Sequence, residues 1–149
     1  EELRKSAKFA RHNERIALLK FVGAEEQIEK YSRDNRFMNW DDLSSLSSSP
    51  LITVGAHTVS HVPLTCLSAL EMIRELRDAR VLLQNKLQLP IEYLSYPYGA
   101  FDNSTILAAK ATGYRAAFTT ASIAKSIDKK SLLLQLPRLE IQFSSGSDI

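Results

Sequence analysis

The sequence is poor in cysteine, in clustered charge and in long apolar runs. Its single cysteine, Cys66, excludes an internal disulfide. The net charge of +2 is spread along 149 residues without a Lys/Arg block, which gives no indication of a nucleic acid or an anionic membrane surface as partner. No apolar run approaches the roughly 18 residues that cross a bilayer, and residues 1–5 do not resemble a signal peptide. At 149 residues the chain fits one globular domain that can bury a substantial core.

Apolar spacing predicts helices in both halves of the chain. Helices are expected over residues 3–21 and 24–33, then over 40–46 with Asn39 as N-cap. Ser68 and Glu71 form a capping-box pattern ahead of a long helix that Pro90 ends. The positions at helical spacing in that helix are Leu70, Ile73, Leu76, Ala79, Leu82, Leu83 and Leu87.

One carboxylate pair stands out before the strands begin. Asp41 and Asp42 follow the predicted N-cap directly. Acidic side chains in a first turn are explained by capping and by the helix dipole, so the pair is assigned to structure rather than to catalysis.

Short apolar runs predict strands between these helices. Strands are expected over residues 51–54, 91–96 and 114–119, with one or two closing strands over 132–136 and 139–143. A helix over residues 104–111, capped by Asp102 or Asn103 and followed by Gly113, separates two of them. Residues 120–131 form a polar connection. The alternation of strand and helix is typical of parallel βα units, in which ligands gather at the carboxyl ends of strands.

His57 and His61 lie four residues apart, directly after the first predicted strand. This spacing would place both side chains on one face of a helical turn. Two neutral imidazoles on one face suit a zinc-like divalent ion, although two surface histidines could also fall at this spacing by chance. Cys66 could add a third ligand but is expected to be a small buried side chain, and His12 lies among charged residues as a solvated surface histidine. The turn at residues 97–99 follows another predicted strand, so its convergence with the histidines favours a metal site.

The ordered motifs resemble those of the polysaccharide deacetylase family, carbohydrate esterase family 4. They are Gly-Ala-His57-Thr-Val-Ser-His61, a long amphipathic helix, Leu94-Ser95-Tyr96-Pro97-Tyr98-Gly99, and Thr112-Gly113-Tyr114-Arg115-Ala116-Ala117-Phe118-Thr119-Thr120. The resemblance runs from about Phe37 to Arg138. It implies a deformed (β/α) barrel and metal-dependent removal of N- or O-acetyl groups from sugar polymers of the chitin, peptidoglycan or polyglucosamine class.

The resemblance also assigns roles to individual residues. His57 and His61 would bind zinc or a similar divalent ion, which would polarise the acetyl carbonyl and activate a water molecule. The segment from Tyr96 through Pro97 and Tyr98 to Gly99 would line the substrate groove, and the backbone N–H of Tyr98 would stabilise the oxyanion. Arg138 could orient a carboxylate, or it could be a surface arginine beside a closing strand.

Three departures from the family pattern alter this expectation. The Thr-Phe-Asp-Asp motif of the first strand, which supplies the general base and the carboxylate ligand, is absent, and Asp41-Asp42 does not replace it. Ser95 occupies the position often held by arginine, and the late Asp-Trp and Leu-x-His motifs are not recognisable. Two histidines alone bind a divalent ion poorly, because catalytic zinc takes three protein ligands and a water. A missing base would cost roughly 10²–10⁴-fold in rate.

The expected architecture is therefore one incomplete domain over residues 1–149, a partial deformed (β/α) barrel without its first strand. Residues 1–36 would form extra N-terminal helices and residues 37–143 the barrel portion. Open strand edges could pair with another copy of the chain. The main hypothesis is a metal-dependent deacetylase of acetylated sugar polymers, whose activity as this chain alone is open. One alternative is a non-catalytic carbohydrate-binding or assembly module derived from such an enzyme. Another is an unrelated βα domain, in which the two histidines would point apart.

Overall fold

The computed structural model of the chain describes Glu14, Ala17, Lys20, Phe21, Gly23 and residues 37–120 and 133–138. Two expected helices, over residues 3–21 and 24–33, lie almost wholly outside this part of the chain. The expected connection over 120–131, apart from Thr120, and the expected strand over 139–143 also lie outside it. Glu14, Ala17, Lys20 and Phe21 have helical backbone, as the first of these predictions requires.

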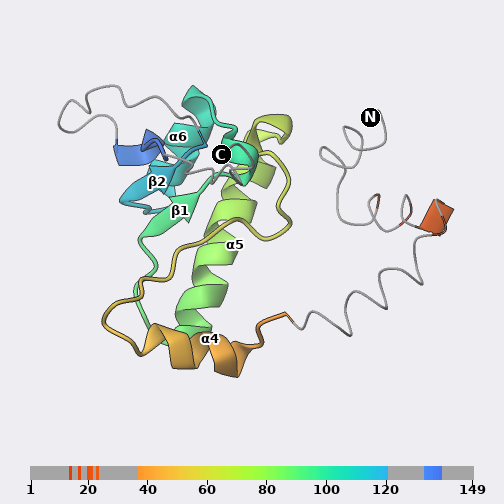
Figure 1. Ribbon diagram of the computed structural model, residues 1–149. Coiled ribbons are helices and arrows are strands. Elements are labelled where there is room, and N and C mark those ends of the chain that lie inside the picture. Colours follow the sequence, from red (N-terminus) through yellow and green to blue (C-terminus); the bar gives the residue numbers. More distant parts are fainter. Residues whose placement is uncertain are drawn as a thin grey trace, which may run out of the picture.

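The described residues form helices α4–α6, strands β1 and β2 and three short 3₁₀ segments (Figure 1). In chain order these are α4 (Trp40–Ser47), η1 (Leu64–Cys66), α5 (Ala69–Leu87), β1 (Tyr93–Ser95), η2 (Pro97–Gly99), α6 (Asn103–Ala111), β2 (Ala116–Phe118) and η3 (Leu133–Gln135). Among them no helix is both long enough and apolar enough to cross a bilayer.

The two strands pair in parallel, with Tyr93 opposite Ala116 and Ser95 opposite Phe118. Helix α6 connects them, so β1–α6–β2 is the βα unit that the alternation predicts. Single bridges extend the sheet on both sides, from Ala56 to Leu94 and from Leu136 to Phe118. The parallel arrangement places the carboxyl ends of these segments along one edge, where the loops after Ala56 and Ser95 meet.

Helices α5 and α6 cover one face of the sheet and share a core with it (Figure 1). Side chains alternate between the faces of a strand, so every second residue of the sheet points at the helices. Their common core is almost free of solvent and consists of Ala56, Leu64, Met72, Leu76, Ala79, Ile91, Leu94, Tyr96, Ala108, Ala109, Tyr114 and Ala117. In α5 the buried set differs from the predicted one: Met72 is buried, whereas Leu70 and Leu82 are 59% and 46% exposed. The predicted apolar positions extend around more of the helix surface than the part that packs against the sheet.

Capping fixes where each helix begins. Asn39 and Asp42 form a reciprocal capping box at α4, which confirms that Asp42 has a structural role. Ser68 and Glu71 form the predicted box at α5. At α6 the cap is Asp102, which accepts from the backbone N–H and the hydroxyl of Thr105. Both bonds lower the pKa of Asp102, and the bond from the Thr105 backbone N–H has the larger effect.

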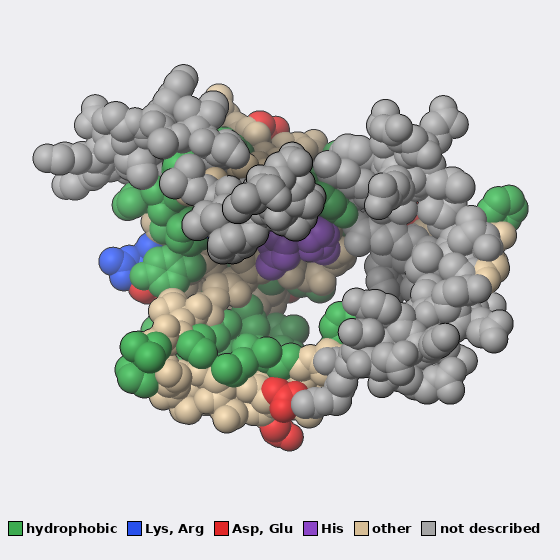
Figure 2. Space-filling model, in the orientation of Figure 1, with side chains coloured by type: hydrophobic (Ala, Val, Ile, Leu, Met, Phe, Trp, Pro, Cys, Tyr) green, Lys and Arg blue, Asp and Glu red, His purple; other side chains and the backbone are tan. Residues whose placement is uncertain are grey.

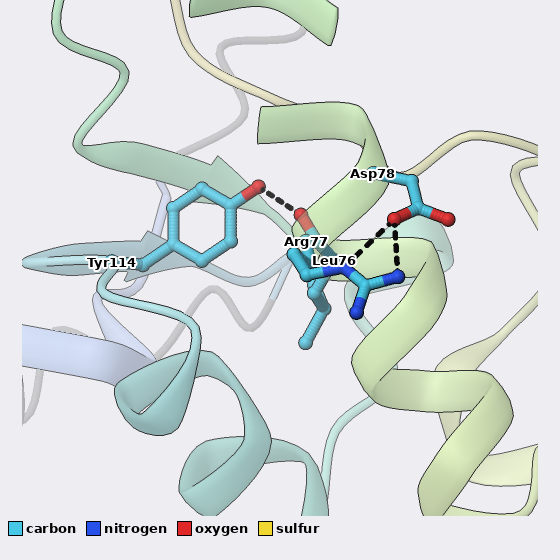
Figure 3. Close-up of polar contacts among 4 residues, drawn as sticks. All are labelled: Leu76, Arg77, Asp78 and Tyr114. Carbon is cyan, nitrogen blue, oxygen red and sulfur yellow. Dashed lines mark hydrogen bonds and ion pairs between the residues drawn. The ribbon is translucent and has the colours of Figure 1, made fainter. Parts of the chain in front are cut away.

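The middle of α5 is joined to the residues that follow α6 by one buried hydrogen bond, from Tyr114, and by part-buried bonds of Arg80. The Tyr114 hydroxyl donates to the Leu76 carbonyl at 2.9 Å, and Figure 3 shows its ring pointing toward α5, while Arg77 and Asp78 pair on the outside of that helix. Burial raises the pKa of Tyr114 to about 12, against a smaller opposing effect of Arg80. Arg80 donates to the carbonyls of Ile91 and Thr112.

Gly113 follows α6 with φ +85°, as predicted for a glycine that ends a helix. A Cβ at this position would also collide with the Arg80 guanidinium. The positive φ is therefore the main reason for glycine here, because the Arg80 side chain could shift to make room for a Cβ.

The strands predicted over residues 51–54 and 132–136 are wrong within the described part of the chain. The Ile52 N–H donates to the Ser49 carbonyl, so residues 49–52 form a turn, and pairing begins only at Ala56. Residues 133–135 form η3, and Leu136 alone bridges to β2 before Pro137, which has no N–H to continue a ladder. The other two strands are shorter than predicted.

Candidate functional site

In the part of the chain that the structure describes, the face of the sheet opposite the helices is open. A groove of about 440 Å³ lies over it, beside the histidine loop, which is defined here as residues 57–61. Figure 2 shows the two described histidines as one patch on this side of the molecule. The groove is lined by Thr53, Gly55, Ala56, His57, Tyr93, Leu94, Ser95, Phe118 and Arg138.

His57 is held by the neighbouring strand. Its Nδ1 lies 2.7 Å from the backbone carbonyl oxygen of Ser95. A carbonyl oxygen can only accept, so Nδ1 carries the proton, and in the neutral ring the lone pair is on Nε2. A backbone carbonyl that orients a histidine in this way is the usual support of a metal-binding imidazole. Ser95 therefore contributes through its carbonyl, whichever side chain it carries.

The rings of His57 and His61 lie next to each other. Their centroids are 4.6 Å apart and their planes are inclined by 75°. The predicted helical turn is wrong: residues 57–61 form an irregular loop in which Thr58 and His61 have φ values of 65° and 59°. The two rings thus lie side by side in this loop rather than on opposite sides of it.

The turn after β1 reaches the same place. The Tyr98 ring centroid lies 4.8 Å from that of His61. The Gly99 N–H donates to the Tyr96 carbonyl, with Pro97 and Tyr98 between them and Tyr98 at φ 57° and ψ 11°. This is the arrangement of a type II turn, which normally has glycine at the second central position.

Backbone strain is concentrated at this site. Four non-glycine residues in the described part of the chain have positive φ, and Thr58, His61 and Tyr98 are three of them. Such a conformation costs on the order of 1–3 kcal/mol per residue and persists only where the surroundings impose it. It is rarest for a β-branched residue such as Thr58. The fold therefore maintains a specific, unfavourable backbone around the histidines and Tyr98.

The four residues predicted to line a substrate groove differ in exposure. Tyr96 and Pro97 are buried, and the Tyr96 hydroxyl donates to the Leu134 carbonyl. Burial raises the pKa of Tyr96. Tyr98 is 36% exposed, and Gly99 packs so closely on Thr120 that a Cβ would overlap it. Tyr98 and the turn backbone are thus the parts of this segment that a ligand could reach.

Arg138 lies over the Phe118 ring, 5.1 Å from its centroid, and both line the groove with His57. The structure thus brings together three of the predicted site residues, His57, His61 and Tyr98, and places Arg138 along the same groove. Cys66 is exposed, so the expectation of a buried thiol is wrong. It follows Pro63, whose carbonyl accepts its N–H in the short turn η1, which holds it at the surface.

The histidine pair fits two positions of a zinc coordination sphere. Catalytic zinc normally takes three protein ligands and a water. Within the part of the chain that the structure describes, no group of three or more His, Cys, Asp or Glu side chains could hold a metal. Cys66 is therefore not a third ligand. Further donors would have to come from elsewhere, as the absence of the Asp-Asp motif already implies.

Sequence reasoning did not identify Glu75. Its carboxylate, on α5, accepts the N–H groups of Val59 and Ser60 and the Ser60 hydroxyl. Glutamate is common on exposed helix faces, and the only available signal was its position about one helical turn after Glu71.

Comparison with known proteins places these features in a family. The family model described as polysaccharide deacetylase matches residues 15–117. YxkH of Bacillus subtilis (strain 168), a candidate polysaccharide deacetylase, is 31% identical over 96 residues, which cover 64% of this chain and 34% of YxkH.

Solved structures have the same fold over part of their length. The Streptococcus pyogenes deacetylase PplD, determined in complex with acetate, superposes with a TM-score of 0.63 at 21% identity, covering 74% of this chain and 49% of PplD. IcaB from Ammonifex degensii gives a TM-score of 0.61 at 20% identity, covering 71% and 48%. The chain thus spans about a third of YxkH and about half of these two structures. Because the family model covers more than half of the sequence, the chain belongs to the polysaccharide deacetylase family.

Proposed function

We propose that the histidine loop and the Tyr98 turn form the metal-binding side of a deacetylase site that acts on acetylated sugar polymers. The adjacency of the two imidazoles carries this proposal: their centroids are 4.6 Å apart, and the His57 Nδ1 is engaged by Ser95. Zinc, or a similar divalent ion, would polarise the acetyl carbonyl and activate a water when bound.

Within this proposal each residue has a defined task. His57 and His61 donate ring nitrogens, and the strand carbonyl of Ser95 fixes the tautomer of His57. The backbone N–H of Tyr98 stabilises the oxyanion, a role that comes from the family resemblance and is supported by the ring contact with His61. Arg138, which lines the same groove, orients a carboxylate.

The proposal extends to the architecture. Residues 37–143 are the barrel portion and residues 1–36 a helical N-terminal segment. The open face of the sheet is the interior of a partial barrel, and the acidic ligand and base belong to a strand not represented by the motifs of this sequence. This is consistent with the shares of YxkH and PplD that the chain covers.

The experiment is an acetate-release assay on the intact protein that contains this chain, loaded with zinc. N-acetylated chitin oligomers, peptidoglycan fragments and an O-acetylated polysaccharide are the substrates. His57→Ala and His61→Ala should abolish release, and Asp78→Asn, at an exposed surface pair, should not change it. Glycan binding without acetate release from any of these would contradict the proposal and favour the binding module.

A further inference from the structure

The carboxylate of Glu75 connects helix α5 to the middle of the histidine loop. Its Oε2 accepts the backbone N–H groups of Val59 and Ser60, both at 2.9 Å. Its Oε1 accepts the Ser60 hydroxyl at 2.7 Å. All three donors lie between His57 and His61, so one side chain holds the segment that sets the distance between the two imidazoles.

This loop needs external support. Residues 57–61 belong to no helix or strand, and Thr58 and His61 have positive φ. One local bond, from the His61 N–H to the Thr58 hydroxyl oxygen at 3.1 Å, closes the turn but does not attach it to the rest of the protein. Hydrogen bonds to a charged carboxylate are among the stronger ones in proteins, so those to Glu75 are well suited to hold a strained backbone.

The attachment point is rigid. Glu75 precedes Leu76, which is fully buried, and α5 is anchored further by Met72 and Ala79 in the core. Glu75 itself is partly buried. His57 is fixed separately, from β1, through Ser95. The loop is therefore held at one end by the sheet and in its middle by α5.

We propose that Glu75 is a positioning residue of the metal site: it holds Val59 and Ser60 so that both imidazoles face one ion. The proposal rests on the proposed function, because it assumes that the pair binds a metal. In this proposal the Glu75 carboxylate acts as a hydrogen-bond acceptor for the loop, and its negative charge near the ion has no part in the effect.

Amide hydrogen exchange tests the attachment without any metal. In Glu75→Ala, the Val59 and Ser60 amides should exchange at least roughly 10-fold faster than in the wild type, since each loses a charge-assisted bond. Asp78→Asn removes a carboxylate from the same helix at a side chain that is more than half exposed, and should leave both rates unchanged. Unchanged exchange in Glu75→Ala would overturn the proposal even if the protein binds zinc.

Cobalt(II) tests the effect on the ligands. Absorption bands of bound Co²⁺ report coordination geometry, which a merely structural role of Glu75 would not alter. Glu75→Ala should change these bands and weaken Zn²⁺ affinity roughly 10–100-fold, as loss of outer-shell partners does. Glu75→Gln has a side chain of the same length and keeps one acceptor oxygen, so it should restore part of the Zn²⁺ affinity and part of the wild-type Co²⁺ spectrum. This variant also tests the proposal if Glu75→Ala does not fold.

The two proposals fail in distinguishable ways. If the wild type and His57→Ala bind Zn²⁺ equally, the metal site is refuted, whatever the exchange data show. If His57→Ala loses Zn²⁺ while Glu75→Ala and Glu75→Gln bind it with wild-type affinity and wild-type Co²⁺ bands, the metal site stands and the role of Glu75 is refuted.

Discussion

The two faces of the small parallel sheet differ in almost every property. On the face toward α5 and α6, Ala117 is fully buried, and Ala56 and Leu94, which also border the groove, are at most 2% exposed. On the other face, His57, Ser95 and Phe118 line an open groove together with Arg138. Because side chains alternate along a strand, neighbouring residues of one short segment belong to these different environments.

One face of the sheet therefore contributes mainly to stability and the other carries the residues of the candidate site. The helix-facing side buries apolar area, which is the main favourable term in folding. The groove side carries the histidine, the strand carbonyl that orients it and the cation–π contact of Arg138. Substitutions on the first face should lower the free energy of unfolding, and substitutions on the second should change binding at nearly constant stability.

Leu94→Ala should have the largest effect. Leu94 is 1% exposed in the middle of β1, and truncating such a residue costs about 2–5 kcal/mol in unfolding free energy, through lost burial and a residual cavity. Urea denaturation measures it. A loss below about 1 kcal/mol would show that the helix-facing side is not the core that the packing indicates.

Tyr114→Phe should have an intermediate effect that depends on pH. Losing the buried bond to the Leu76 carbonyl should cost about 1 kcal/mol at pH 8. Tyrosine has a pKa near 10 in the unfolded chain and about 12 here, so its contribution is complete below pH 10 and is lost as the pH rises toward 12. The difference between wild type and variant should therefore narrow in alkali, as measured by urea denaturation at pH 8 and pH 11.

Tyr93→Phe is the matched control for this substitution. Tyr93 lines the groove, and removing its hydroxyl should change the unfolding free energy by less than about 0.5 kcal/mol. A constant difference between wild type and Tyr114→Phe at all pH values would contradict the buried position of the Tyr114 hydroxyl.

Ser95→Ala should have the smallest effect. Its side chain is on the groove side, next to Leu94 in the same strand, and it contributes to the site through its backbone carbonyl, which alanine retains. Stability should change by less than about 0.5 kcal/mol, and Zn²⁺ affinity should stay at the wild-type value. A large loss of either would show that the two faces are not separable at this position.

Much of the fold follows from local sequence signals. Asn39, Ser68 and Asp102 mark the helix starts because capping depends on side chains within one turn. The predictions of strands over residues 51–54 and 132–136 were wrong because a local apolar run does not show whether a turn competes for the same residues. Residues 49–52 form a turn that contains Ser49 and Pro50, and Pro137 limits pairing after Leu136.

The sequence allowed the residues of the candidate site to be predicted, but not the conformation in which they lie. His57 and His61 follow from their spacing, and the Tyr98 turn from Pro97 and Gly99. The loop conformation depends on Glu75, which is 14 residues after His61 in the sequence, and on a carbonyl of β1. Such long-range bonds have no local signal. Pairing of copies through strand edges stays a prediction.

The most direct test of the account is whether the two imidazoles share one ion. Isothermal titration of the intact protein with Zn²⁺ should show a site that is lost in both His57→Ala and His61→Ala, while the melting temperature of the metal-free protein is unchanged, because both side chains lie outside the core. Zinc affinity that is unchanged in either variant would contradict the account.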